Sequence, residues 1–242
     1  MITVLGLAKY KSQEYYDSNM AEDGPVSAKD HYLKCLVRAF LAGIMISVGG
    51  CVFIGCTDRG VGWVGAILFA IGLFTIFHFG FDLYTGKVGY ALENKPSYII
   101  DLLVIILGNF IGCLMIGFMM PLDTAVTFVN ARMADVDYLR VLFKGILCGL
   151  LMFIAADYYK KTKGFLGAFV AVPVFILSGF EHSIADMFYF ASAFFKDSGC
   201  FALGDGALFI LVVIIGNAIG GLLIPLCQKY MYENPPAWFK KE

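Results

Sequence analysis

Two short segments place carboxylates, hydroxyls and a histidine within otherwise apolar sequence. Residues 80–87 read GFDLYTGK, and residues 178–183 read SGFEHS. A carboxylate beside an imidazole can serve as an acid and base pair or can bind a small ion. The segments match each other as Gly-Phe-acid, with Asp82 in the first and Glu181 in the second. We therefore expect the two segments to serve one site.

The composition of the chain indicates a membrane protein. Hydrophobic residues make up 60% of the 242 residues and charged residues only 15%, and the mean hydropathy is +0.78. The charges are clustered, as a bilayer requires, because a charge at its centre costs at least about 2.5–3.5 kcal/mol. The formal net charge is -1, and basic patches with interleaved aromatic residues are absent, so nucleic acid is not an expected partner.

The apolar stretches predict six membrane-spanning helices, because a helix needs about 20 apolar residues to cross roughly 30 Å of hydrocarbon. The expected spans are 39–57, 60–81, 102–122, 138–158, 165–180 with a continuation past Ile184, and 206–228. Most Lys and Arg residues fall on the side of the two termini, which predicts cytoplasmic termini and an inner-membrane location. The expected parts are a cytoplasmic tail at 1–30, a six-helix transmembrane domain at 31–232 and a second cytoplasmic tail at 233–242.

The second and fifth spans are predicted to be broken helices. Backbone that leaves a helix at membrane depth is tolerated only where it is buried in protein or lines a wet cavity. Carboxylates and hydroxyl residues cap helices well, so the carboxylates, Asp82 and Glu181, and the hydroxyl residues of the two segments are suited to cap helices that restart after each break. The alternative is a continuous helix kinked at glycine, with both carboxylates in ordinary interhelical hydrogen bonds.

Three landmarks recur in the same order in the two halves of the chain. Besides the Gly-Phe-acid segments, residues 107–112 resemble 215–220, and residues 40–44 weakly resemble 142–146. Each half holds three spans, so the second half is expected to be inverted relative to the first. Inverted repeats with broken helices place a substrate path at the repeat interface, which predicts transport. The repeated glycines would equally serve close helix packing.

These motifs resemble those of the formate/nitrite transporter family. Residues 80–86 resemble its Gly-x-Asp/Glu-Leu-Phe-Thr-Gly motif, and residues 178–187 resemble its Ser-Gly-Phe/Tyr-Glu-His-Ser-Ile/Val-Ala-Asn-Met motif. Residues 143–148 resemble its Lys-Gly-x-Leu-Cys segment. The resemblance implies an all-α integral membrane protein with an aquaporin-like fold of six transmembrane helices. It also implies a homopentamer that carries a short monovalent anion such as formate, nitrite or hydrosulfide, often with a proton.

The resemblance also implies roles for particular residues. His182 and Thr85 would face the pathway, and Lys144 would draw anions inward from the extracytoplasmic side. Hydrophobic constrictions would be formed by Phe69, Leu73 and Phe175, with Leu83 and Tyr84 near them. The helix breaks would be supported by Asp82, Glu181, Asp186, Gly149, Asn109 and Asn217.

Three residues depart from the family pattern. Gly149 stands where an asparagine beside the histidine is common, which leaves the hydrogen bonding of His182 open. Tyr84 replaces a phenylalanine and adds a hydroxyl. Asp186 replaces an asparagine, and if residues 183–190 are helical it lies one turn from His182, where it would favour an imidazolium. The alternative is that Asp186 caps a turn or faces the lipid headgroups.

Formate is the expected substrate, because the resemblance to the family favours it. Nitrite, hydrosulfide, acetate and lactate stay open, because a pocket separates such analogues by only a few kcal/mol. An integral-membrane enzyme could use His182 and Glu181 as acid and base. The sequence has no nucleophile elbow, HExxH or redox-cofactor motif, so we expect no catalysis, no cofactor and no bound metal.

Overall fold

The computed structural model describes residues 27–233, and this part of the chain consists of helices joined by turns and loops and contains no strand. The helices are α2 (Ala28–Thr57), α3 (Gly62–Leu68), α4 (Ala70–Phe79), α5 (Tyr84–Lys87), the 3-10 helix η1 (Val88–Glu93), α6 (Tyr98–Met119), α7 (Asp123–Met133), α8 (Tyr138–Thr162), α9 (Leu166–Leu177), α10 (Ser183–Lys196) and α11 (Leu203–Glu233). The tails predicted at 1–30 and 233–242 lie almost wholly outside the described residues.

Within residues 27–233, five helical segments are long and apolar enough to cross a membrane. They are Ala28–Thr57, Gly62–Phe79, Tyr98–Met119, Tyr138–Thr162 and Leu203–Met231. The remaining apolar segment, α9, has only 12 residues. It coincides with the first part of the predicted fifth span, which therefore cannot cross a membrane as one straight helix.

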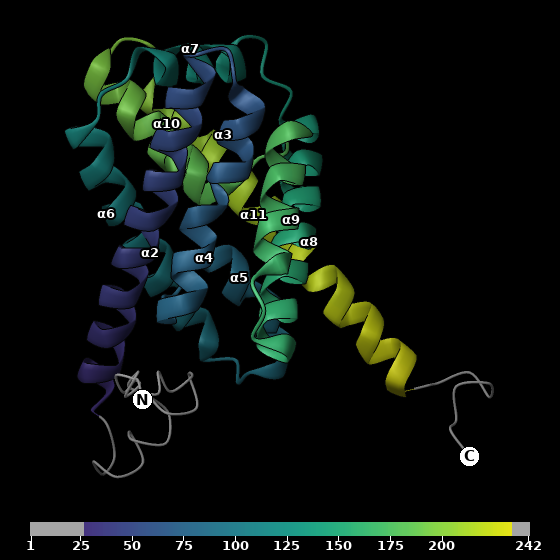
Figure 1. The fold of residues 1–242 in the computed structure, drawn as a ribbon. Coiled ribbons are helices and arrows are strands. Elements are labelled where there is room, and N and C mark those ends of the chain that lie inside the picture. The colour runs from purple at the N-terminus through teal and green to yellow at the C-terminus, as the bar shows by residue number, and fades with distance from the viewer. Residues whose placement is uncertain (1–26, 234–242) are drawn as a thin grey trace, which may run out of the picture.

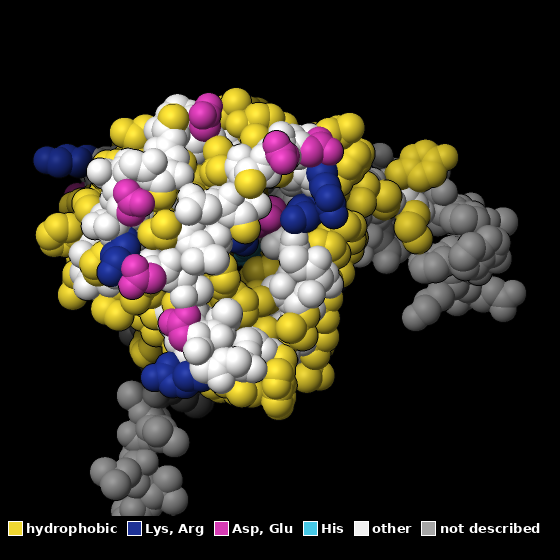
Figure 2. All heavy atoms as spheres, turned by 90° about the horizontal axis from the view of Figure 1, so that it is seen from above, with side chains coloured by type: hydrophobic (Ala, Val, Ile, Leu, Met, Phe, Trp, Pro, Cys, Tyr) yellow, Lys and Arg dark blue, Asp and Glu magenta, His cyan; other side chains and the backbone are white. Residues whose placement is uncertain are grey.

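The long helices pack as neighbours in two matching pairs. α2 runs along α6, and α8 runs along α11. α7 lies across one end of the molecule, and the short helix α5 lies toward the other end (Figure 1). α10 packs against α6 and α7, and every residue from Ser183 to Ala193 is buried. Seen from the α7 end, the surface is hollowed near its centre, with acidic and basic side chains spread around the hollow (Figure 2).

Two helices end in the same way before the Gly-Phe-acid segments. α4 stops at Gly80, whose φ is 67°, and the turn after α9 contains Gly179 with a φ of 66°. Only glycine adopts this left-handed conformation without strain, so it ends a helix well. The amide of Phe81 then donates to the carbonyl of Ile76 at 2.9 Å, and that of Phe180 to the carbonyl of Phe175 at 3.0 Å.

The capping residues differ from the sequence prediction. The N-cap of α5 is Leu83, whose side chain makes no capping hydrogen bond. The N-cap of α10 is His182, whose Nδ1 accepts from the amide of Ala185 at 3.2 Å. The prediction that Asp82 and Glu181 cap these helices was wrong, because both carboxylates instead face basic side chains. For Asp82 these include Lys87, at the far end of α5 itself.

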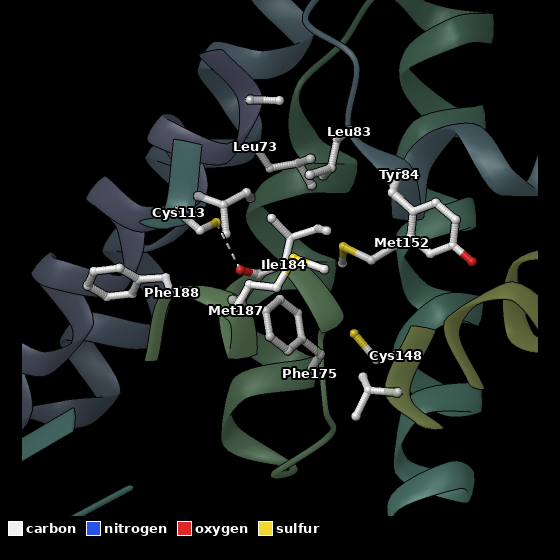
Figure 3. Close-up of a cluster of buried hydrophobic side chains, with 14 of the residues drawn as sticks. Leu73, Leu83, Tyr84, Cys113, Cys148, Met152, Phe175, Ile184, Met187 and Phe188 are labelled. Carbon is white, nitrogen blue, oxygen red and sulfur yellow. Dashed lines mark hydrogen bonds between the residues drawn. The ribbon is translucent and has the colours of Figure 1, made fainter. Parts of the chain in front are cut away.

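An apolar cluster fills the space between the two restarting helices. Figure 3 shows Leu73 and Leu83 pointing toward one another, with Ile184, Met187 and Phe175 below them. The thiol of Cys113 in α6 donates to the carbonyl of Ile184 at 3.3 Å, which ties α6 to the first turn of α10. The centre of the molecule is therefore apolar packing that surrounds a few polar groups.

Candidate functional site

Two asparagines on neighbouring helices hold the chain segments that precede α5 and α10. Oδ1 of Asn109 in α6 accepts from the amide of Tyr84 at 3.0 Å. Nδ2 of Asn109 donates to the carbonyls of Ala39 at 2.7 Å and Asp82 at 2.9 Å. One buried amide side chain thus satisfies an N–H that the helix start leaves open and two further carbonyls.

The second asparagine repeats this arrangement at the other segment. Oδ1 of Asn217 in α11 accepts from the amide of Ser183 at 2.9 Å. Nδ2 of Asn217 donates to the carbonyls of Gly145 at 2.8 Å and Glu181 at 3.0 Å. Both asparagines are fully buried. These amides, rather than the acidic side chains, satisfy the first backbone amides of the restarting helices.

The first carboxylate is bound by two cations. Asp82 lies 2.6 Å from Nε of Arg38 in α2 and 2.8 Å from Nζ of Lys87 in α5, and its side chain is only 2% exposed. A carboxylate buried this deeply requires such partners, and removal of one partner of a buried pair costs about 3–5 kcal/mol. The pairing of Asp82 with Arg38 and Lys87 was not predicted from the sequence.

The second carboxylate also has two cations. Oε2 of Glu181 lies 3.0 Å from Nε of Arg132 in α7, and Oε1 lies 3.4 Å from Nζ of Lys144 in α8. Nε of Arg132 also lies 3.6 Å from Oδ1 of Asp186. Burial alone would lower the pKa of the Arg132 guanidinium, but the charges of Glu181 and Asp186 outweigh burial and raise it. Arg132 is therefore a fixed positive charge.

The role of Arg132 was not predicted from the sequence. Arg132 lies in the last turn of α7, whose other charged residue is Asp123 in the first turn. The signal for it is Asp186, because an aspartate in place of an amide at a buried position brings a charge that needs a partner. That partner lies on a helix 54 residues earlier in the chain (186 less 132).

The close contacts of two glycines show which residues of the first half of the chain correspond to which residues of the second half. A Cβ atom at Gly43 would collide with the main chain of Asn109, and one at Gly149 would collide with the main chain of Asn217. Gly43 therefore matches Gly149, and the weak match of Gly43 with Gly145 seen in the sequence was wrong by one helical turn. When Gly43 is aligned with Gly149, Arg38 aligns with Lys144, so the Arg38–Asp82 ion pair of the first half corresponds to the Lys144–Glu181 ion pair of the second half.

Gly149 also answers the question raised by its departure from the family pattern. Its missing side chain leaves room for the backbone of Asn217, so an asparagine could not stand there without moving α11 away from α8. The hydrogen-bond partners of His182 are instead the hydroxyl of Thr85 and the amide of Ala185.

His182 and Thr85 join the two Gly-Phe-acid regions at the centre of the molecule. Oγ1 of Thr85 lies 3.1 Å from Nε2 of His182, and both residues are buried. Because the amide of Ala185 donates to Nδ1, the neutral imidazole carries its hydrogen on Nε2 and donates it to the threonine. The ring of Phe175 stacks on that of His182, with the centroids 5.4 Å apart.

The apolar site residues gather around this pair. Phe69 and Phe175 meet edge to face with centroids 6.0 Å apart, and Leu73 and Leu83 complete the buried cluster (Figure 3). Tyr84 lies in the same cluster, and its hydroxyl donates to the carbonyl of Ile214 at 3.1 Å. The hydroxyl that distinguishes Tyr84 from phenylalanine is therefore used to bind α11.

A cavity of about 170 Å³ lies on the α7 side of His182. Its polar lining comes from Arg132, His182, Asp186 and Tyr189, and its apolar lining includes Phe175. Asp186 is 1% exposed and lies in the first turn of α10, one turn from His182. Lys144 is not part of the lining but contacts Glu181 beside it. A volume of this size holds a few small molecules such as waters or one short acid.

The family of the chain follows from a comparison with known proteins. The model of the family described as "Formate/nitrite transporter" matches residues 16–231. The chain belongs to the formate/nitrite transporter family. With its apolar helices, this membership makes it a multi-pass membrane protein.

Relatives of this chain carry different anions, according to their names. The chain is 31% identical to the nitrite transporter NirC of Escherichia coli over 144 residues, which covers 54% of this chain and 53% of NirC. It spans about half the length of the curated nitrite transporters that it matches. It is 29% identical to the formate channel FocA of Escherichia coli, over 69% of this chain and 68% of FocA.

Solved structures of the family share the fold. A structure described as an FNT family ion channel matches with a TM-score of 0.76 and 26% identity, over 92% of this chain and 98% of that chain. One described as a pentameric formate channel with formate bound matches with a TM-score of 0.68 and 21% identity, over 86% and 100%. Because the sequence identity is only 21%, this second similarity is evidence for a shared fold alone.

Proposed function

We propose that this chain forms a transmembrane pathway for a small monovalent anion, with formate as the first candidate. Family membership and the likeness to FocA over about two thirds of both chains support this assignment. The observation that carries it is the contact between Thr85 and His182, which places polar groups from both Gly-Phe-acid regions together inside an apolar core.

The proposed architecture has six transmembrane helices in two inverted three-helix repeats, aquaporin-like, with the second and fifth helices broken. The matched hydrogen bonds of Asn109 and Asn217 and the paired left-handed glycines support it. We propose a homopentamer in the inner membrane, with both termini cytoplasmic. The pentamer is supported by the fold shared with a structure described as pentameric, and the orientation by the positive-inside rule.

The pathway faces one physical problem, which is the cost of desolvating an ion. A bare anion enters an apolar constriction only at a cost of many kcal/mol. Lys144, about one third exposed on its side chain, raises the anion concentration near the mouth. His182 then offers a hydrogen bond, or a proton, at mid-membrane. A neutral acid passes Phe69, Leu73 and Phe175 without that cost.

Nitrite is the second candidate. The identity to the nitrite transporter NirC is slightly higher than that to FocA, although it covers only about half of each chain. Nitrite and formate are both bent monovalent anions with three non-hydrogen atoms. The cavity of about 170 Å³ beside His182 therefore excludes neither by volume.

The test is anion flux into proteoliposomes that contain the purified protein. Formate, nitrite, hydrosulfide and acetate are compared for wild type and His182→Ala at external pH from 5 to 8. The proposal expects selective flux that rises as the pH falls and that is lost in the variant. Equal flux in both proteins would reduce His182 to a structural residue, and no flux of any anion in the wild type would refute the proposed function.

A further inference from the structure

Asp186 has an oxygen that the rest of the site leaves unsatisfied. Its Oδ1 faces Nε of Arg132 at 3.6 Å, while its Oδ2 is buried and has no hydrogen-bond partner among the described residues. A buried carboxylate oxygen without a donor is costly. Asp186 also lines the cavity beside His182, so a molecule in the cavity has direct access to this residue.

The charges around Asp186 balance only when every group is ionised. Arg132 and Lys144 supply two positive charges, and Glu181 and Asp186 supply two negative charges. The other titratable groups that face this region are His182 and Tyr189 on α10, Cys148 on α8, and Cys51 on α2, which faces Tyr189. With Asp186 ionised, the cluster offers an anion no net attraction.

A proton on Asp186 corrects the charge balance, and the O–H group that it creates needs an acceptor, which an anion bound in the cavity supplies. The proton turns Oδ2 from an acceptor without a donor into a donor, and it leaves the cluster with one net positive charge. A monovalent anion in the cavity would then be matched in charge and would accept a hydrogen bond from Asp186. Arg132 stays charged, because it lies against Glu181 at 3.0 Å and over the ring of Tyr189 at 5.6 Å.

We propose that Asp186 carries a proton on Oδ2 and shares it with a short weak-acid anion bound in the cavity between Arg132 and His182. When the proton crosses, the O–H bond to Asp186 breaks and an O–H bond to the anion forms. The neutral acid leaves toward Thr85, and Asp186 takes another proton from the water on the α7 side. This proposal rests on the proposed function and assigns the protonation step to a residue one turn beyond the histidine.

The first test compares Asp186→Asn with wild type in proteoliposomes. An asparagine amide donates a hydrogen bond but has no proton to transfer. We expect the ratio of formate flux at pH 5.5 to that at pH 7.5 to be several-fold in wild type and below about twofold in the variant. Formate-driven proton uptake, followed with a dye inside the liposomes, should be lost in parallel. The same ratio and the same proton uptake in both proteins would overturn the proposal.

A matched control is Asp205→Asn. Asp205 is an exposed carboxylate in the first turn of α11, at the same end of the molecule but outside the cavity lining. It should keep the wild-type flux ratio. If Asp205→Asn flattened the ratio as much as Asp186→Asn, the pH dependence would reflect overall surface charge, and the proposal would be refuted.

A second measurement uses only the wild-type protein and does not depend on flux or on a folded variant. Protein labelled with ¹³C at the aspartate side-chain carboxyl is examined by infrared difference spectroscopy with and without formate. We expect an aspartic acid C=O band near neutral pH that shifts when formate is added. Asp82 should not respond to formate, because it lies outside the cavity lining and is bound by Arg38 and Lys87, and Glu181 carries no label. The absence of any such band would refute the proposal while leaving the transport assignment to the flux assay.

Discussion

Oγ1 of Thr85 lies 3.1 Å from Nε2 of His182, although the two residues are 97 positions apart in the chain. The helices α5 and α10, which restart after the two Gly-Phe-acid regions, thereby meet through one hydrogen bond. The imidazole is held on both sides, because its Nδ1 accepts from the amide of Ala185. The orientation and the tautomer of His182 are thus fixed before any substrate binds.

Removal of this hydrogen bond should impair transport. In Thr85→Val the shape of the side chain is kept, but the buried Nε2–H loses its acceptor, at a cost of about 1–3 kcal/mol. We expect formate flux to fall at least about fivefold, measured in proteoliposomes at equal protein content. Thr85→Ser keeps the hydroxyl and should retain most of the flux. A loss of flux in Thr85→Ser but not in Thr85→Val would show that the methyl group, rather than the hydroxyl, matters.

Asn217 should be essential for folding. Asn217→Leu removes three hydrogen bonds and leaves the amide of Ser183 and the carbonyls of Gly145 and Glu181 buried without a donor or an acceptor. At about 1–3 kcal/mol for each group, the loss is comparable to the whole stability of many domains. Thermal unfolding in detergent should show a large drop in Tm or no recoverable protein. Asn130→Leu, at an exposed position of α7, is the control and should behave as wild type.

Gly149 should not tolerate even one added methyl group. In Gly149→Ala the new Cβ meets the main chain of Asn217, which cannot move without α11. Overpacking of this kind costs about 1–3 kcal/mol, so Tm should fall. Gly204→Ala is the matched control, because no neighbouring atom lies within 4 Å of a Cβ built there. Equal Tm values for both variants would contradict the close approach of α8 and α11.

Lys144 should affect transport in a salt-dependent way. Lys144→Gln removes a partly exposed positive charge that contacts Glu181 at 3.4 Å. Attraction between an anion and an exposed charge is screened by salt, so the loss of flux should be largest at low ionic strength and should shrink near 0.15 M salt. Lys144→Arg keeps the charge and should retain the flux. A loss that does not change with salt would indicate that Lys144 acts only by holding Glu181.

The sequence predicted the apolar spans and the places where two of them stop being helical. These features depend on local composition, since hydropathy sets the spans, and glycine followed by a carboxylate marks positions such as 80–82 and 179–181. The motif containing His182 also indicated the family, which the match over residues 16–231 confirmed.

The capping of the restarting helices could not be predicted from the sequence. Asp82 and Glu181 have the right chemistry for caps, but the side chains of Asn109 and Asn217 fill that role from other helices. Nothing in the local sequence reveals which of two suitable side chains lies nearer to a backbone amide.

The sequence by itself thus determined the membrane class, the interrupted spans and the central histidine, because each depends on residues that are close together along the chain. Only the tertiary structure decided the partners of the buried charges, such as Arg132 with Glu181 and Asp186. It also decided the one-turn register that matches Gly43 with Gly149. These relationships join residues on separate helices, and helix packing at close approach fixes them to within one turn.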